Sequence, residues 1–359
     1  MKKLILLAAA VTFAFAANAK VWRINYDENA NADFKTITAA CNSAKVANTD
    51  TLYCEPGRHQ ASGDDNKVTR DGMKVFGPGW GFEPNYGGTS TLAAAEFSSA
   101  IKIAANNVKV SGVVASIDFY AVSHKTLKNI TIERCKCYHI ESNAVNGDSL
   151  KNIRIERCNI THKLELQAAA KKDIYICNNI VRIGNSYCFN IEGNTGNINI
   201  LRNTILIDND YGRVVVKNAL VQDNIMIHTY NANYKPFDFS QTGNVIRKNV
   251  FSLSGGATEN AEIVANYPDN YYVGATAAGT FTCKTGSIYR TEEYYMLKDG
   301  SPAKNAAYDG GDCGAFGGST PFIICGRPQG IPYITDVEVP AQPKDNKLTV
   351  TFKVANQNE

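Results

Sequence analysis

The chain is short of the features that would place it in several common classes of protein. Beyond its first 19 residues, no apolar run reaches the roughly 20 residues that a membrane-spanning helix needs. None of its cysteines stand in the CxxC spacing of a zinc site, and no basic stripe of the kind that binds nucleic acid is present. These absences argue against membrane insertion, a cysteine zinc site and a nucleic-acid partner.

The N-terminus has the pattern of an export signal. Two lysines precede an apolar stretch from Leu4 to Ala17, which ends in the small residues Ala17 and Ala19. Residues 1–19 are therefore predicted to be a signal peptide, with the mature chain beginning at Lys20. No cysteine follows the apolar stretch closely, so a lipid anchor is not indicated. We expect a secreted or periplasmic protein.

The charge balance does not point to a polyanionic partner. Loss of the two lysines of the signal peptide leaves 35 of the 37 basic residues against 34 acidic ones. A net charge near zero gives no long-range attraction for nucleic acid or for a charged membrane surface. We expect a monomer. The mature chain is longer than a typical domain, but a solenoid grows by adding coils, so one elongated domain is the simpler organisation.

A short phrase recurs along the middle of the chain. It reads NITIERC at 129–135, NIRIERC at 152–158, DIYICNN at 173–179, NINILRN at 197–203, LVQDN at 220–224 and VIRKN at 245–249. The ends of consecutive phrases are 23, 21, 24, 21 and 25 residues apart. A period in the low twenties with β-branched runs is typical of a solenoid of stacked strands, in which each repeat is one coil.

Each phrase alternates apolar and polar residues, as in Ile130 and Ile132 against Thr131 and Glu133, which is the two-residue period of a strand. Such a run must stack in parallel on the equivalent run of the next coil. The sequence therefore predicts an all-β fold, a single-stranded parallel β-helix whose coils run from about residue 108 to 253. The isoleucines in matching places should share one core: Ile130, Ile132, Ile153, Ile155, Ile174, Ile176, Ile198 and Ile200.

The residues that end the phrases are predicted to stack at one corner. Asparagine tolerates left-handed backbone angles, and its amide both donates and accepts hydrogen bonds along a stack. Such a ladder would contain Asn179, Asn203, Asn224 and Asn249, continued by the small thiols of Cys135 and Cys158. Disulfides are permitted in an exported chain but not required. Recurrence with the coil period favours buried thiols at Cys135, Cys137, Cys158, Cys177 and Cys188.

Outside the repeats, the chain has a distinct beginning and end. Phe34, Ile37, Ala40, Cys41 and Ala44 mark a short amphipathic helix, which we expect to cap the N-terminal end of the solenoid. A strand is expected at residues 51–55. The domain prediction is a signal peptide at 1–19, a β-helix domain with its N-terminal cap at 20–331, and a short C-terminal β tail at 332–359 packed on the solenoid.

Three stretches resemble the exported right-handed parallel β-helix proteins of pectate-lyase-like fold from glycan-degrading bacteria. They are the opening DFKTITAACNSAKVANTDTLYCEPGRH, the coils, and the closing LKDGSPAKNAAYDGGDCGAFGG at 297–318, which is similar to the usual last coil of secreted members. The resemblance implies a right-handed winding and polysaccharide as the partner. Many members cleave acidic polysaccharides, whereas others have no assigned activity, and a fold alone does not carry function.

A lyase is favoured over a glycoside hydrolase. The chain has no Gly-His-Gly of the polygalacturonase kind, and its acidic pairs, Asp64 with Asp65 and Asp208 with Asp210, lie in contexts that suit turns. A β-eliminating lyase needs a base and a cation, or Ca²⁺, that neutralises the uronic carboxylate. The noncatalytic alternative is a protein that binds glycan or serves as a surface structural or adhesion protein, with the solenoid as scaffold.

The candidate site is a polar stripe on the second strand of the central coils. In the segments LELQ, FNIE, RVVVK and FDF, polar residues alternate with apolar ones and should point outward. Lys217 or Arg213 is the candidate base. The candidate substrate-binding residues are Glu165, Gln167, Asn190, Glu192 and Asp238, of which Glu165, Glu192 and Asp238 are also candidate Ca²⁺ ligands or acid partners of the base. A solvated outer face is the structural alternative.

Two further candidates lie elsewhere. His139 and His162 each follow a corner residue by four positions, so they are predicted to be neighbours on consecutive coils, where a structural role is favoured over metal binding or proton transfer. Trp80, in a Gly-rich loop, is a candidate for stacking on a sugar ring, or alternatively for packing.

Overall fold

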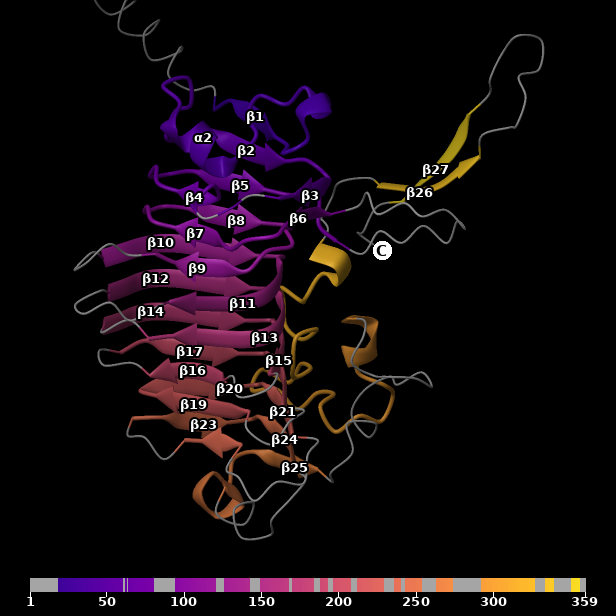
Figure 1. The fold of residues 1–359 in the computed structure, drawn as a ribbon. Helices are drawn as coiled ribbons and strands as arrows, with labels where there is room; N and C mark the ends of the chain where they lie inside the picture. The colour runs from indigo at the N-terminus through magenta and orange to yellow at the C-terminus, as the bar shows by residue number, and fades with distance from the viewer. Residues whose placement is uncertain are drawn as a thin grey trace, which may run out of the picture.

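The computed structural model of the chain describes residues 19–60, 62, 64–80, 94–120, 126–142, 149–167, 170–183, 188–192, 196–207, 212–228, 236–239, 243–253, 263–273, 292–326, 333–338 and 350–355. Most of these residues form an all-β parallel solenoid, as the repeat predicts (Figure 1). The predicted signal peptide falls almost wholly on residues 1–18, which lie outside the described part of the chain. The right-handed winding likewise stays a prediction.

The first face of the solenoid, face 1, is a ten-stranded sheet in which the repeated phrases stack in order. Ile153 of one phrase pairs with Ile130 on one side and with Ile174 on the other, so the predicted register is confirmed. Parallel pairing starts earlier than predicted, at Val21. The strands of face 1 are β1 (Val21–Ile24), β2 (Thr51–Cys54), β5 (Lys74–Phe76), β8 (Lys109–Ser111), β10 (Thr126–Glu133), β12 (Ser149–Glu156), β14 (Ala170–Cys177), β17 (Ile198–Leu201), β20 (Ala219–Gln222) and β23 (Val245–Arg247).

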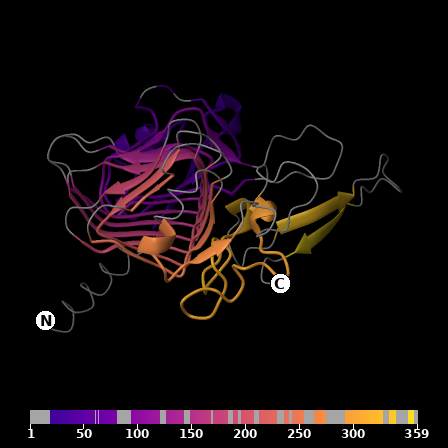
Figure 2. The ribbon, with the colours of Figure 1, turned by 90° about the horizontal axis from the view of Figure 1, so that it is seen from below.

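The other two faces are joined by β11 (Lys136–Ser142) and β13 (Asn159–Leu166), whose first residues belong to face 2 and whose last residues belong to face 3. Face 2 also contains β3 (Gly57–His59), β6 (Ala95–Phe97), β15 (Ile180–Ile183), β18 (Thr204–Ile207), β21 (Ile225–His228), β24 (Val250–Leu253) and β25 (Tyr271–Val273). Face 3 also contains β4 (Lys67–Val68), β7 (Ile101–Ile103), β9 (Ile117–Phe119), β16 (Cys188–Glu192), β19 (Arg213–Lys217) and β22 (Phe237–Asp238). Figure 2 looks along the stack and shows the coils superimposed.

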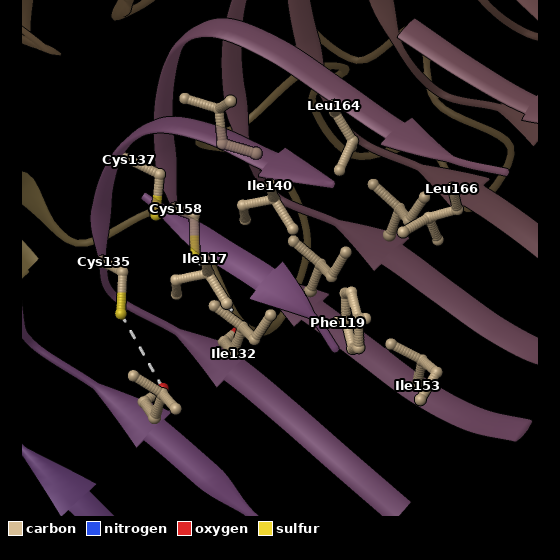
Figure 3. Packing of buried hydrophobic residues seen from close by; sticks show 14 of the residues in the cluster. Ile117, Phe119, Ile132, Cys135, Cys137, Ile140, Ile153, Cys158, Leu164 and Leu166 are labelled. Carbon is tan, nitrogen blue, oxygen red and sulfur yellow. Dashed lines mark hydrogen bonds between the residues drawn. The ribbon is translucent and has the colours of Figure 1, made fainter. Parts of the chain in front are cut away.

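The interior is a continuous apolar stack. All eight isoleucines predicted to share a core are at most 2% exposed. Figure 3 shows Ile132 and Ile153 of face 1 pointing into the same interior as Ile140 and Leu164. The thiols of Cys135, Cys137, Cys158 and Cys177 are buried and free, as predicted, whereas the side chain of Cys188 lies outside the described part.

The corner ladder of asparagines is confirmed atom by atom. The Oδ1 of Asn203 accepts hydrogen bonds from the backbone N and the Nδ2 of Asn179, at 3.0 and 2.9 Å. The same two bonds run from Asn203 to Asn224 and from Asn224 to Asn249. Cys158 joins the ladder through its backbone N, which donates to Asn179 Oδ1 at 2.8 Å. Each asparagine therefore ties its coil to the next.

A short helix lies at the N-terminal end of the stack. Helix α2 (Ile37–Asn42) begins after Thr36, whose hydroxyl accepts a hydrogen bond from the backbone N of Ala39 at 3.1 Å. It is shorter than the predicted 34–44, because Phe34 forms a β-bridge with Ile24. Its buried side chains are part of the solenoid core, so the helix covers the end of that core.

Residues 292–326, which we name the C-terminal strap, run along the outside of face 2 (Figure 1). The strap contains the 3-10 turns η3 (Glu292–Tyr295) and η4 (Ile324–Gly326) and no strand. The expectation that residues 297–318 form a last coil is therefore wrong. The physical reason is that the outward side of face 2 is apolar and needs a cover. Strap residues such as Ala303 and Phe322 form one apolar cluster with Leu206, Ile225 and Ile227.

Turn residues after the face 1 strands hold the strap in place. Arg134 and Asn178 both have positive φ, at 50° and 54°, so they occupy the same left-handed turn position in different coils. The Nη1 of Arg134 donates to the carbonyl of Gly326 at 3.1 Å, and the Nδ2 of Asn178 donates to the carbonyl of Ala315 at 3.0 Å. These bonds satisfy strap carbonyls that face the solenoid.

Glu133 directly precedes Arg134, which holds the strap, and is 8% exposed. Its carboxylate is 3.1 Å from the amine of Lys109 and 3.2 Å from the guanidinium of Arg157. Burial alone would raise the pKa of Glu133, but the hydrogen bond from Lys109 and the positive charges around the carboxylate hold it below the ordinary value of 4.5.

Replacing Glu133 with glutamine is expected to destabilise the protein by about 1–3 kcal/mol at neutral pH. A carboxyl with a lowered folded-state pKa stabilises the fold above its unfolded pKa, and this stabilisation disappears as the pH falls through the folded pKa. In urea unfolding curves, the stability difference between wild type and Glu133→Gln should therefore narrow as the pH falls from neutral to values below the ordinary pKa of glutamate. The exposed Glu96→Gln is the control and should differ little from wild type at either pH. If the stability difference between wild type and Glu133→Gln did not change with pH, the ion-pair assignment would be wrong.

The C-terminal tail forms a sheet of its own. Strands β26 (Tyr333–Glu338) and β27 (Thr351–Ala355) pair antiparallel with each other, and their hairpin lies to one side of the coils in Figures 1 and 2. The described part of the tail gives no support for packing of residues 332–359 on the solenoid. Other helical segments are short, such as η1 (Glu28–Ala30) and a turn at 263–266. Within the described ranges, no helix is long and apolar enough to cross a membrane.

Candidate functional site

A row of polar side chains runs along the outside of face 3. Strand pairing places Glu141 between Asp118 and Glu165, and Asn190 follows Glu165 on the next coil. The row continues through the backbone register to Asp238 on β22. Since consecutive coils are about 4.8 Å apart, the row presents polar groups at this spacing from Asp118 to Asn190 and, after the apolar Val215, again at Asp238. We name it the face 3 row.

Lys163 lies beside the row and is held by two of its carboxylates. Its amine lies 2.7 Å from Glu141 Oε2 and 2.7 Å from Glu165 Oε2, so it bridges carboxylates of two consecutive coils. Glu165 also accepts hydrogen bonds from Gln167 and, at 3.4 Å, from Asn190. Three predicted stripe residues, Glu165, Gln167 and Asn190, thus lie together. Lys163 and Glu141, which sequence analysis did not indicate, join them.

The two carboxylates set the charge state of Lys163. Burial by itself would lower the pKa of this amine, but the hydrogen bonds to Glu141 and Glu165 raise it well above the ordinary value. Lys163 is therefore a fixed cation at neutral pH and not a base. Glu165, at 7% exposed and with three hydrogen-bonding neighbours, is held in place as the counter-charge.

Beside this bridge, Asp118, His139 and Glu141 form a compact group. The Nε2 of His139 is 3.1 Å from Asp118 Oδ1 and 3.8 Å from Glu141 Oε1, and all three ligand atoms lie within 4.8 Å of one another. One imidazole and two carboxylates are a donor set that divalent cations accept. The same set could instead pass a proton between the imidazole and a carboxylate.

A register shift decides which histidine faces the row. Strand β13 has one more residue than β11 between the matched pairs Cys137 with Ile160 and His139 with Lys163. His139 and His162 do lie on consecutive coils, on β11 and β13, but they are one residue out of register with each other. His139 pairs with Lys163, and His162 stacks instead on the ring of Tyr138, with centroids 4.2 Å apart.

The row extends toward the N-terminus through lysines that the sequence did not indicate. Lys102 on β7 pairs with Asp118 on one side and with Lys67 on the other. The amine of Lys102 is 2.7 Å from Asp64 Oδ1, and both lysines lie over the ring of Tyr120. Asp64 is thus an ion-pair partner on this face, although its sequence context suggested only a turn.

The two candidate bases, Arg213 and Lys217, lie at opposite ends of β19. Arg213 and Lys217 are both outward and partly exposed, because Val214 and Val216 between them are buried. Four residues along a strand separate them by about 13 Å, so they cannot act on the same proton. Arg213 pairs in register with Cys188, and Lys217 pairs with Glu192. The side chain of Glu192 lies outside the described part of the chain.

Trp80 does not present its ring to a ligand. It is 2% exposed, its Nε1 donates to Glu292 Oε1 at 2.8 Å, and its backbone N donates to the carbonyl of Cys325 at 2.7 Å. Of the two roles considered for Trp80, packing is the one that this geometry supports. Its ring joins the apolar cluster between the solenoid and the strap.

The missed residues of the row share one cause. Asp118, Glu141 and Lys163 lie on strands whose sequences carry no repeated phrase, so only the pairing of β9, β11 and β13 shows that they stack. Alternation was a usable signal for Asp118, which stands between the buried Ile117 and Phe119, as in the segments that were identified. It was weaker for Glu141 and Lys163, because each has a polar neighbour on its strand.

Comparison with known proteins does not place the chain in a family. No protein-family model matches it, and a search of curated proteins found no match. The parallel solenoid is shared by proteins of many activities and does not specify one. The functional inference therefore depends on the residues of face 3.

Proposed function

We propose that face 3 binds an acidic polysaccharide, with the glycan chain lying along the row. The observation that carries the proposal is the bridge of Lys163 between Glu141 and Glu165, because it fixes alternating charges at coil spacing on an open face. A polymer of charged sugar units suits such a periodic array. The predicted export signal at residues 1–19 would bring the protein to the compartment where such glycans occur.

The chemistry of uronic acids fits the cations of the face. Lys102, Arg213 and Lys217 can pair with carboxylates of the glycan, and the amides of Gln167 and Asn190 can bind hydroxyl groups. Ca²⁺ held by carboxylates such as Glu192 and Asp238 would add a further bridge to a uronate. Every sugar contact in this description is made by a residue of β7, β16, β19 or β22, apart from Gln167, which directly follows β13.

Catalysis by β-elimination is the reaction that this set could perform. A base removes the proton at C5 beside the uronic carboxylate, the electron pair forms a C4–C5 double bond, and the glycosidic oxygen leaves from C4 with a proton from a nearby acid. Lys217 is the candidate base, and Arg213 is better suited to neutralising a carboxylate because its guanidinium stays protonated. Lys163, held protonated, contributes charge only. The second candidate is a binding protein without turnover. The ion pairs within the row favour this candidate over the lyase.

The test is binding and turnover on a panel of uronic-acid polysaccharides, with and without Ca²⁺. Wild type is expected to bind at least one member, and the Arg213→Ala, Lys217→Ala double variant should lose about tenfold in affinity, as loss of charged contacts implies. The matched control is Lys128→Ala with Lys151→Ala, two exposed lysines of face 1. Calorimetry measures affinity, and absorbance of unsaturated sugars measures turnover.

The outcomes separate the two candidates. In a lyase, Lys217→Ala abolishes product formation while most affinity remains, and Asp238→Asn weakens any dependence on Ca²⁺. In a binding protein, the same variants lower affinity in modest steps, and no unsaturated product forms with wild type. A double variant of Arg213 and Lys217 that keeps full affinity for every bound glycan would move the site away from face 3.

A further inference from the structure

A hollow opens at the corner between face 2 and face 3. Its volume is about 370 Å³, within the range of about 300–1,000 Å³ that is usual for small-ligand pockets. Its walls come from four successive coils, at residues 96–98, 114–116, 136–138 and 161. None of its lining residues belongs to the face 3 row.

Tyr138 forms one wall of the hollow and is the large aromatic side chain on its rim. The ring is 55% exposed and stacks on His162, with an interplanar angle of 19°. His162 belongs to the coil on the C-terminal side, whereas most of the hollow is built by coils on the N-terminal side. The ring face opposite His162 therefore borders the hollow. An open tyrosine face beside a recess is suited to packing against the apolar face of a sugar ring.

The rest of the lining has the polarity of a site for an uncharged, hydroxyl-rich ligand. Glu96 and Lys136 lie in one column, separated by Val114, and so stand two coil spacings or about 10 Å apart. One acidic and one basic side chain leave no net charge. Ser98, Ser116 and Thr161 add hydroxyl groups. A neutral monosaccharide unit matches this combination better than a uronic acid.

The hollow adjoins the face 3 row through consecutive residues. The rings of Tyr138 and His139 are 6.0 Å apart, and His139 contacts Asp118 in the row. We propose that the hollow receives a single neutral sugar attached as a branch to the acidic glycan chain that lies along face 3. This inference rests on the proposed function and adds to it that the natural ligand is a branched polysaccharide.

The experiment compares a uronic-acid polysaccharide bearing neutral monosaccharide branches with the same polymer after enzymatic removal of the branches. Tyr138→Ala is expected to lower affinity for the branched polymer by about tenfold, the order of one aromatic contact, and to leave affinity for the debranched polymer unchanged. Glu96→Ala, on the opposite wall, should have the same selective effect. Tyr175→Ala, an outward tyrosine of face 1, is the matched control, and thermal unfolding confirms that each variant is folded.

Three other outcomes of this experiment would each contradict a different part of the proposal. Equal loss of affinity on both polymers would show that the hollow binds the main chain and not a branch. Unchanged affinity of Tyr138→Ala and Glu96→Ala on both polymers would show that the hollow is no sugar site, while face 3 binding stands. Wild-type protein that binds neither polymer would overturn the proposed function, and the branch proposal with it.

Discussion

Replacing Ile155 with aspartate is expected to lower the free energy of unfolding by roughly 3–5 kcal/mol. Ile155 is fully buried in the middle of face 1, between Ile132 and Ile176 of the neighbouring coils. A carboxylate there would lie in an apolar stack, where its charge is neither hydrated nor paired. Urea unfolding followed by circular dichroism measures the loss.

The control for Ile155 lies on the same strand. Lys151 is exposed on β12, so Lys151→Asp changes the charge of the strand without entering the core, and its effect should stay within about 0.5 kcal/mol. Wild-type stability in Ile155→Asp would mean that the inward face of the repeat has been misassigned. Destabilisation of both variants to the same extent would point to strand propensity and not to burial.

Replacing Asn203 with alanine is expected to destabilise the protein by about 3 kcal/mol or more, because several buried polar groups lose their partners together. Asn203 is fully buried. Its Oδ1 accepts from the N and Nδ2 of Asn179, and its Nδ2 donates to the carbonyl of Ile176 at 2.9 Å and to Asn224 Oδ1 at 3.0 Å. The backbone N of Asn179 and the carbonyl of Ile176 would lose these partners, whereas Asn224 Oδ1 would keep the bond from the backbone N of residue 203.

The neighbouring strand residue Asn199 provides the comparison. It points outward and is half-buried on β17, so Asn199→Ala should change stability by less than about 1 kcal/mol. Thermal and urea unfolding of the two variants measure the difference. If Asn203→Ala were no less stable than Asn199→Ala, the ladder would contribute nothing that water cannot replace.

Within the site, sequence reasoning found some residues and missed their partners for an identifiable reason. Glu165 was found because Leu164 and Leu166 flank it with the period of a strand. The main partner of Glu165 is Lys163, two residues away on the same strand. Lys163 acts as a bridge only because Glu141 lies beside it on the previous coil. Pairing between coils depends on the lengths of the intervening loops, which vary, and on the extra residue in β13.

What the sequence by itself determined is the coil: its period, its inward isoleucines and its asparagine corner, because these depend on contacts between equivalent positions of consecutive repeats. Only the tertiary structure decided the contacts between non-equivalent positions. The strap crosses face 2 because the outward side chains of Leu206 and Ile227 need a cover, and Trp80 is buried where the strap ends. Lys163 joins two carboxylates because a one-residue register shift aligns it with His139. Periodicity specifies such a stack locally, whereas covering surfaces and shifted registers depend on how the whole chain packs.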